Sequence, residues 1–120
     1  MDLMRLSKAD VLYGDPRDWQ GVFTPNECTA ADRNKDPIRY LTSVWALREA
    51  VVKVLGGFQD GLAPTDLEIC DALLNYPSLK ATGGAAIELR RKGIDQILLA
   101  GLSNADLVFG IAIGLSAPTG

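Results

Sequence analysis

The residues best suited to chemistry are the basic side chains between positions 80 and 92. Four of them stand there against one acidic residue, Glu88. Such a cluster can neutralise phosphates, because lysine and arginine displace the counterions around a nucleic-acid backbone. Cations at the C-terminal end of a helix also complement the helix dipole, so a purely structural role stays open. The residues expected to contact DNA are Lys80, Thr82, Gly83, Gly84, Arg90, Arg91 and Lys92.

The chain lacks the residues that most catalytic mechanisms require. The chain has no histidine, which excludes Ser-His and Cys-His nucleophile pairs. Its two cysteines, Cys28 and Cys70, are too few for a four-ligand zinc site. The glycine pairs lack the lysine and spacing of a phosphate-binding loop, and no pair of carboxylates is placed to suggest acid–base work. We therefore expect a protein that is not an enzyme and that uses no cofactor and no metal.

Composition predicts a globular protein of the cytoplasm. The chain has 120 residues, 48% of them hydrophobic, and a net charge of −3, so any contact with nucleic acid needs a local basic patch. Residues 94–117 are apolar, but Asp95, Asn104 and Asp106 make a membrane span unfavourable. The two remote cysteines and an N-terminus unlike a signal peptide indicate a reducing compartment.

Residues 1–36 predict an irregular arm, because Pro16 and Pro25 interrupt any helix. Trp19, Val22 and Phe23 would pin this arm to the core, or the arm reaches a partner chain. The remaining residues, 37–120, are expected to form one domain.

Three helices should position the basic cluster. The first spans 37–56, with Asp36 as N-cap, Pro37 at the first position and Gly56-Gly57 at its end. Its apolar face also carries Arg48, whose head either reaches water or pairs with a carboxylate. The second starts at a capping box formed by Thr65 and Glu68 and runs to about residue 75. The third starts at Ser78 or Thr82 and ends at Gly93.

Residues 108–115 alternate between large and small side chains, which favours a strand. Residues 94–100 are its expected hairpin partner, with a turn at 103–106; one or two helices over 94–113 are the alternative. Phe109, Ile111, Ile113 and Leu115 would cover the helical core. Gly110, Ala112 and Gly114 would leave an open face for another chain.

This order of elements resembles the winged helix-turn-helix superfamily over residues 38–115. The resemblance implies a mainly α (α+β) fold: a three-helix helix-turn-helix core, a C-terminal β-hairpin wing and the irregular arm. It also implies that the helix ending at Lys92 enters the major groove of DNA. The residues that carry it are Thr65, Glu68, Ile69, Leu73, Ser78, Ala86, Leu89, Gly93 and Ile94.

Two functions follow. The first is a small DNA-binding regulator of transcription. The second is a non-catalytic assembly or inhibitory subunit, viral or otherwise, that binds protein, because residues 93–120 contain no lysine or arginine for gripping phosphates. The partner would be a second copy in a homodimer or a larger protein. Its expected contacts are Phe109, Gly110, Ile111, Ala112 and Ile113.

Overall fold

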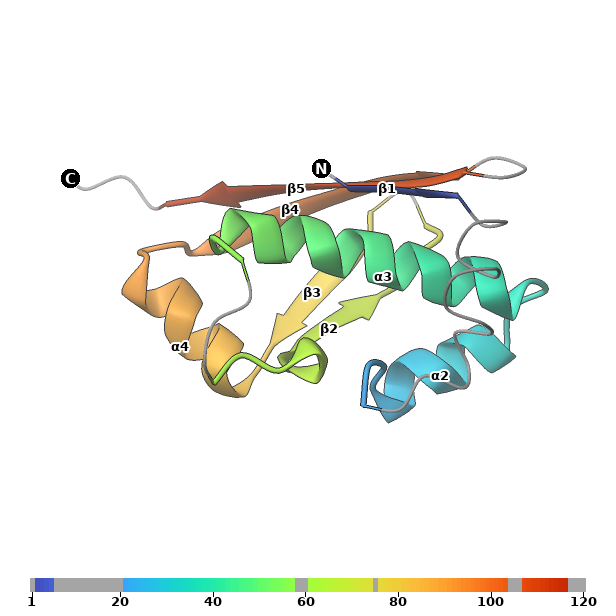
Figure 1. Ribbon diagram of the computed structural model, residues 1–120, viewed down its shortest axis with the longest axis horizontal. Coiled ribbons are helices and arrows are strands. Elements are labelled where there is room, and N and C mark those ends of the chain that lie inside the picture. The colour runs from blue at the N-terminus through green and yellow to red at the C-terminus, as the bar shows by residue number, and fades with distance from the viewer. Residues whose placement is uncertain (1, 6–20, 58–60, 75, 104–106, 117–120) are drawn as a thin grey trace.

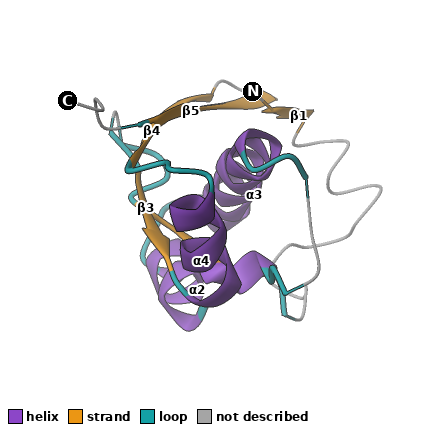
Figure 2. Cartoon of the chain, turned by 90° about the vertical axis from the view of Figure 1, so that its left-hand side faces the viewer, coloured by secondary structure: helices purple, strands orange, loops and turns teal. Residues whose placement is uncertain are grey.

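One long helix lies between a three-stranded sheet on one side and a β-hairpin with two shorter helices on the other (Figures 1 and 2). The computed structural model describes residues 2–5, 21–57, 61–74, 76–103 and 107–116. None of the helices in these ranges is long and apolar enough to cross a membrane. The elements are β1 (Asp2–Arg5), α2 (Pro25–Asp32), α3 (Pro37–Val54), a 3₁₀ turn (Pro64–Asp66), β2 (Leu67–Cys70), β3 (Ser78–Ala81), α4 (Gly83–Arg91), β4 (Gln96–Ser103) and β5 (Leu107–Leu115).

The larger sheet has the order β1-β5-β4, and both of its pairings are antiparallel. Asp2 pairs with Gly110 in one ladder, and Leu99 pairs with Ala112 in the other. The expected hairpin between residues 94–100 and 108–115 is therefore confirmed. Its predicted turn lies, apart from Ser103, outside the described residues.

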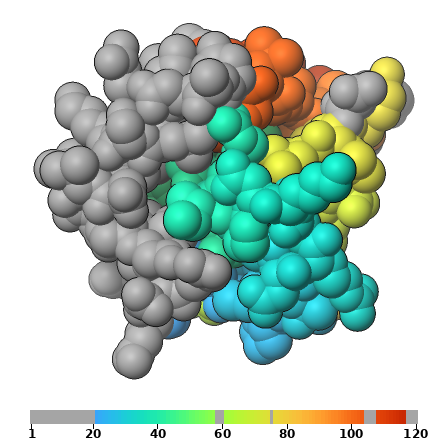
Figure 3. Space-filling view, turned by 90° about the vertical axis from the view of Figure 1, so that its right-hand side faces the viewer, coloured from blue at the N-terminus to red at the C-terminus, as the bar shows by residue number. Residues whose placement is uncertain are grey.

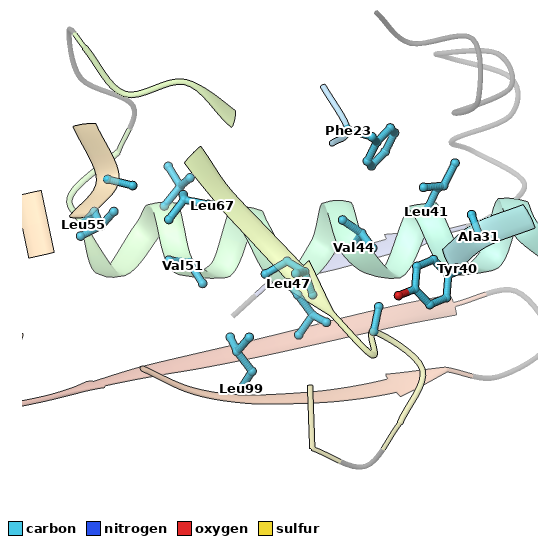
Figure 4. Close-up of a cluster of buried hydrophobic side chains, with 14 residues drawn as sticks. Phe23, Ala31, Tyr40, Leu41, Val44, Leu47, Val51, Leu55, Leu67 and Leu99 are labelled. Atoms are coloured by element: carbon cyan, nitrogen blue, oxygen red, sulfur yellow. The ribbon is translucent and has the colours of Figure 1, made fainter. Parts of the chain in front are cut away.

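The central helix α3 begins and ends close to the predicted positions. Asp36 caps it by accepting a hydrogen bond from the backbone N–H of Arg39 at 3.1 Å, and Pro37 occupies the first turn. Gly56 and Gly57 follow with positive φ, a conformation that glycine adopts without strain. The core gathers around this helix (Figure 4). Its α3 members include Leu41, Val44, Leu47, Val51 and Leu55.

The helix expected from Thr65 is wrong. Thr65 lies in a 3₁₀ turn, and Glu68 lies in β2, which pairs with β3. Leu67, Glu68 and Ile69 are all buried, so the segment is an interior strand and not the amphipathic helix that the T-x-x-E spacing indicates. Pairing with the following strand, β3, outweighed the local capping signal.

The same spacing forms a capping box in the expected irregular arm. Thr24 caps α2, its hydroxyl accepting from the N–H of Glu27 at 3.1 Å, while Glu27 accepts from the N–H of Thr24 at 2.9 Å. Strand β1 also comes from this region and pairs with β5. The arm prediction is thus wrong for β1 and α2, while Trp19 lies outside the described residues.

The two faces of β5 are reversed relative to the prediction. A Cβ added to Gly110 would lie 3.0 Å from backbone atoms of Ala46 and Leu47 in α3. A Cβ added to Gly114 would lie 3.0 Å from the side chain of Val54. The small residues therefore let α3 approach the sheet, and the large ones point away from it. Ile113 and Leu115 are 52% and 40% exposed.

The three-helix core with a wing is wrong as a whole. Of the three expected helices, α3 and α4 exist, but the β2–β3 hairpin stands between them in sequence. In addition, β4 and β5 form one sheet with β1 rather than a separate wing. A helix-turn-helix needs two helices joined by a short turn, and residues 61–82 supply strands instead.

Helix α4 starts with two glycines because its first turn touches the chain at Gly61. A Cβ on Gly84 would lie only 1.9 Å from the carbonyl oxygen of Gly61. Gly83 has a φ of +51° and stands against the carboxylate of Asp66. The end of α4 matches the prediction: Gly93 has positive φ, and the N–H of Ile94 donates to the carbonyl of Leu89 at 3.0 Å.

A buried ion pair holds α3 against α2 and β2. Arg48 and Glu27 are both fully buried, and the Arg48 Nη2 atom donates to both carboxylate oxygens of Glu27. Arg48 Nε also donates to the carbonyl of Leu67 at 3.0 Å, and Nη1 donates to that of Val22 at 2.5 Å. Of the two sequence-based alternatives for Arg48, the carboxylate partner is the one observed.

At the end of the molecule where α3 begins, α2 and the start of α3 lie side by side on the surface (Figure 3).

We expect Gly84→Ala to lower the free energy of unfolding by about 1 to 3 kcal/mol, because the new methyl group collides with a backbone oxygen. Gly101→Ala is the matched control, since its Cβ would meet no atom closer than 3.6 Å. Urea unfolding of both variants measures the difference. Equal stabilities would contradict the close approach of Gly61 to α4.

We expect Arg48→Met to lower the free energy of unfolding by about 3 to 5 kcal/mol, because it leaves the Glu27 carboxylate buried without its counter-charge. Adding Glu27→Gln should recover part of this loss, since glutamine keeps an acceptor and carries no charge. Denaturant unfolding of the two single variants and the double variant measures the coupling. Strictly additive losses would show that the two charges act independently.

Candidate functional site

Three side chains, spaced four apart, form the least buried stripe of α3 in the part of the chain that the structure describes. Between positions 40 and 53 every residue of this helix is buried except Trp45, Glu49 and Lys53. Their spacing of four places them one above the other on a helix. Trp45 and Glu49 are half-buried, and Lys53 is exposed. An indole, a carboxylate and an ammonium group thus line a surface fixed by a rigid helix.

Two packing contacts on other sides of α3 determine which side of the helix carries this stripe. The buried Arg48 directs one side of α3 toward β2, and the close approach of Gly110 directs another toward the sheet. Strand β1 forms the edge of that sheet beside α3. Asp2 pairs there with Gly110, the position that packs on Ala46. The register therefore brings an acidic position of β1 to the part of α3 that precedes Glu49.

The cysteines offer no nucleophile at this stripe. Both thiols are free, and burial is the main cause that raises the pKa of Cys28 and of Cys70 above its ordinary value. Both therefore stay protonated at neutral pH. The described residues also contain no group of three or more potential metal ligands.

A groove of about 570 Å³ lies between β3, α4 and β4. Its lining is mainly aliphatic, with Leu79, Leu89 and Ile97 among its walls, and Asp95 is its one charged lining residue. None of the three stripe residues contributes to it. A groove lined without cations is poorly suited to an anionic ligand, whereas the stripe carries an ammonium group.

The residues expected to contact DNA belong to β3 and to the two ends of α4. Lys80 lies in β3, Thr82 precedes α4, and the glycines of α4 meet Gly61 and Asp66 of the chain itself. At the end of α4, Arg91 donates to Glu88 at 2.5 Å and the Lys92 ammonium lies 3.7 Å from it. The Arg91 hydrogen bond lowers the pKa of the Glu88 carboxyl. Two of the four cations thus have an intrahelical partner.

Of the expected partner contacts, Gly110 and Ala112 face α3 and the core. Phe109, Ile111 and Ile113 alternate with them and lie on the outer face of the sheet. Sequence reasoning missed Glu49 and Lys53 as a site, since both fit an ordinary solvent-facing side of a helix. The signal that could have found them is a helix apolar on nearly all sides, with one charged stripe left.

The sequence matches the family model of the 4'-phosphopantetheinyl transferase superfamily over residues 1–105. Curated relatives include holo-[acyl-carrier-protein] synthases of Methylobacterium sp. (strain 4-46) and Nitratidesulfovibrio vulgaris (strain DP4). The first is 34% identical over 73% of this chain and 65% of its own length, and the second is 32% identical over 77% and 73%. Most of the similar curated relatives are matched over less than two thirds of their length, as with 59% in Sodalis glossinidius.

Solved structures share the fold. The holo-[acyl-carrier-protein] synthase of Neisseria meningitidis superposes with a TM-score of 0.80 at 22% identity, covering 96% of this chain and 94% of that one. The Helicobacter pylori synthase, solved in complex with coenzyme A, gives 0.74 at 16% identity, covering 95% and 96%. These likenesses replace the winged helix-turn-helix resemblance.

The same findings overturn the functional expectations. A DNA-binding regulator of transcription is wrong, and so are a non-catalytic subunit and the expectation of no enzyme, because the matched family is one of transferases. The exclusions based on histidine, cysteine and glycine motifs did not cover phosphoryl transfer, which relies on carboxylates, cations and positioning. The family model covers most of the chain, and the chain belongs to the 4'-phosphopantetheinyl transferase superfamily.

Proposed function

We propose that this chain transfers the 4'-phosphopantetheine group of coenzyme A to a hydroxyl group of an acyl carrier protein. Its membership in the superfamily and the names of its relatives support this reaction. The observation that carries it is the placement of a carboxylate, Glu49, and an ammonium group, Lys53, one turn apart on the same stripe of α3.

The reaction exchanges one phosphorus–oxygen bond for another. The hydroxyl oxygen attacks the phosphorus next to pantetheine, the bridging bond of the diphosphate breaks, and adenosine 3',5'-bisphosphate leaves. The hydroxyl proton is released. Little covalent work falls to the protein, which must hold the diphosphate and balance its negative charge.

The stripe contains groups suited to both tasks. The Lys53 ammonium can bind a phosphate oxygen as a point charge. Glu49 fits the way proteins hold Mg²⁺, through one or two carboxylates with substrate phosphates completing the shell. When bound, such a cation supplies charge neutralisation at the diphosphate. Glu49 would hold it from a half-buried position on a rigid helix.

A second feature concerns assembly. Leu98, Leu102, Ile113 and Leu115 lie on the outer face of β4 and β5 and are 40 to 73% exposed. Leu98 and Ile113 are direct cross-strand partners. Figures 1 and 2 show no described element on this side of the sheet. An exposed apolar sheet face of this kind is typical of an interface, and we propose that copies of this chain associate through it.

We expect Glu49→Gln to lower the rate of transfer by about 100-fold or more, and Lys53→Ala by about tenfold or more, because both groups balance charge at the diphosphate. Mass spectrometry of the carrier protein after incubation with coenzyme A and Mg²⁺ measures transfer. Glu88→Gln and Lys80→Ala, which change the same residue types outside the stripe, are the controls. Wild-type rates in Glu49→Gln would remove the stripe from the reaction, and a wild-type chain without transfer would refute the proposed function.

We expect the double variant Leu98→Lys/Ile113→Lys to sediment as a smaller species than the wild type, because it places two charges on the outer sheet face. Ile87→Lys, at a residue that is 64% exposed on α4, is the control and should leave the sedimentation unchanged. Gly110→Lys is unsuitable here, since it would force α3 from the sheet. A monomeric wild type over the whole concentration range would disprove the interface.

A further inference from the structure

The buried ion pair lies directly beside the stripe in sequence. Arg48 precedes Glu49, and successive residues of a helix point about 100° apart. All contacts of the Arg48 head group described above are made to segments outside α3: Val22, Glu27 and Leu67. The direction of Glu49 is therefore coupled to atoms of α2 and β2.

The pair also takes the place of a neighbouring strand. Strand β2 pairs with β3 along one edge, and its other edge presents the carbonyl of Leu67 and the N–H of Ile69. Arg48 donates to that carbonyl at 3.0 Å, and Glu27 accepts from that N–H at 2.8 Å. Because residues two apart on a strand present the same edge, these two bonds fix the pair along β2.

The other contacts of α3 fix its rotation less tightly. Against the sheet, the helix rests on the flat surface around Gly110 and Gly114, where apolar contacts are not directional. Near the start of the helix, the Arg39 side chain donates a solvent-exposed hydrogen bond to the hydroxyl of Ser103. A planar guanidinium that donates in three directions tolerates little rotation, because each bond depends on its angle. The buried Arg48 side chain thus contributes directional bonds to three residues, which restrict the rotation of α3 about its axis.

Stability alone does not account for the pair. Burying two charges is costly, and apolar residues of similar volume often stabilise a protein as well or better. An apolar pair would, however, leave this edge of β2 unpaired and remove the buried directional bond between α3 and β2. The pair therefore provides geometric definition that a hydrophobic contact would not.

We infer that Arg48 and Glu27 are positioning residues, which hold the Glu49 carboxylate in the direction needed to bind a divalent cation with the diphosphate. This inference rests on the proposed function and deepens it. Neither residue touches substrate; both act through the rotation of α3.

The experiment compares Arg48→Lys and Glu27→Gln with the wild type. Arg48→Lys keeps the positive charge, but its ammonium group cannot reach Val22, Leu67 and Glu27 together. Glu27→Gln is the milder change and serves if Arg48→Lys does not fold. The first readout is the affinity for Mn²⁺ in the presence of ADP, measured by electron paramagnetic resonance without any transfer reaction. The second is the Mg²⁺ concentration that gives half-maximal transfer. Leu99→Ala, a core truncation in β4, serves as the control for lost stability.

In Arg48→Lys we expect the affinity for Mn²⁺ to fall by about tenfold and the half-maximal Mg²⁺ concentration to rise by about tenfold. Changes of this size are found for residues that orient metal ligands. Leu99→Ala should show wild-type values in both readouts at temperatures where it is folded. Unchanged metal affinity in both pair variants, or an equal change in Leu99→Ala, would overturn the inference while leaving the proposed function intact. A wild-type chain that binds no Mn²⁺ with ADP and transfers nothing would instead refute the proposed function itself.

Discussion

The structure depends on a single charged contact in its interior, the pairing of Arg48 with Glu27. Glu27 also accepts backbone N–H bonds from Thr24 and Ile69, so one carboxylate joins the start of α2, strand β2 and helix α3. The Thr24 hydroxyl in turn donates to Glu68 at 2.5 Å. A buried charge of this kind is tolerated only when its partners are complete. The three segments must therefore assemble together, although they lie far apart in the sequence.

The candidate site follows from this assembly. Helix α3 is enclosed by the sheet on one side and by β2 with α2 on another. As a result, most of its residues from position 40 to position 53 are buried. Trp45, Glu49 and Lys53 occupy what remains. Phosphoryl transfer needs charged groups at fixed positions more than it needs a reactive side chain. A rigid helix with one charged stripe satisfies that need without a histidine or a reactive cysteine.

The sequence predicted the features that depend on local chemistry. Asp36-Pro37 and Gly56-Gly57 delimit α3, Gly93 ends α4, and the alternation after Val108 indicates β5. The sequence-based prediction failed where contacts with other segments determine the local structure. The Thr65–Glu68 spacing is as good a capping signal as Thr24–Glu27, but Glu68 is held in β2 by pairing with β3 and by the Thr24 hydroxyl. The site was missed for the same reason: Glu49 and Lys53 are unremarkable until burial of the rest of α3 is known.

Strand β5 shows how a sequence can encode two surfaces without any change in polarity. Gly110, Ala112 and Gly114 alternate with Phe109, Ile111 and Ile113, and both sets are apolar. Bulk distinguishes the faces here, and the smaller side chains mark the side nearer the helix. The two faces consequently tolerate different changes of side-chain size. On the inner face, an added methyl group at either glycine displaces α3, whereas the outer residues can vary in shape together with whatever surface they meet.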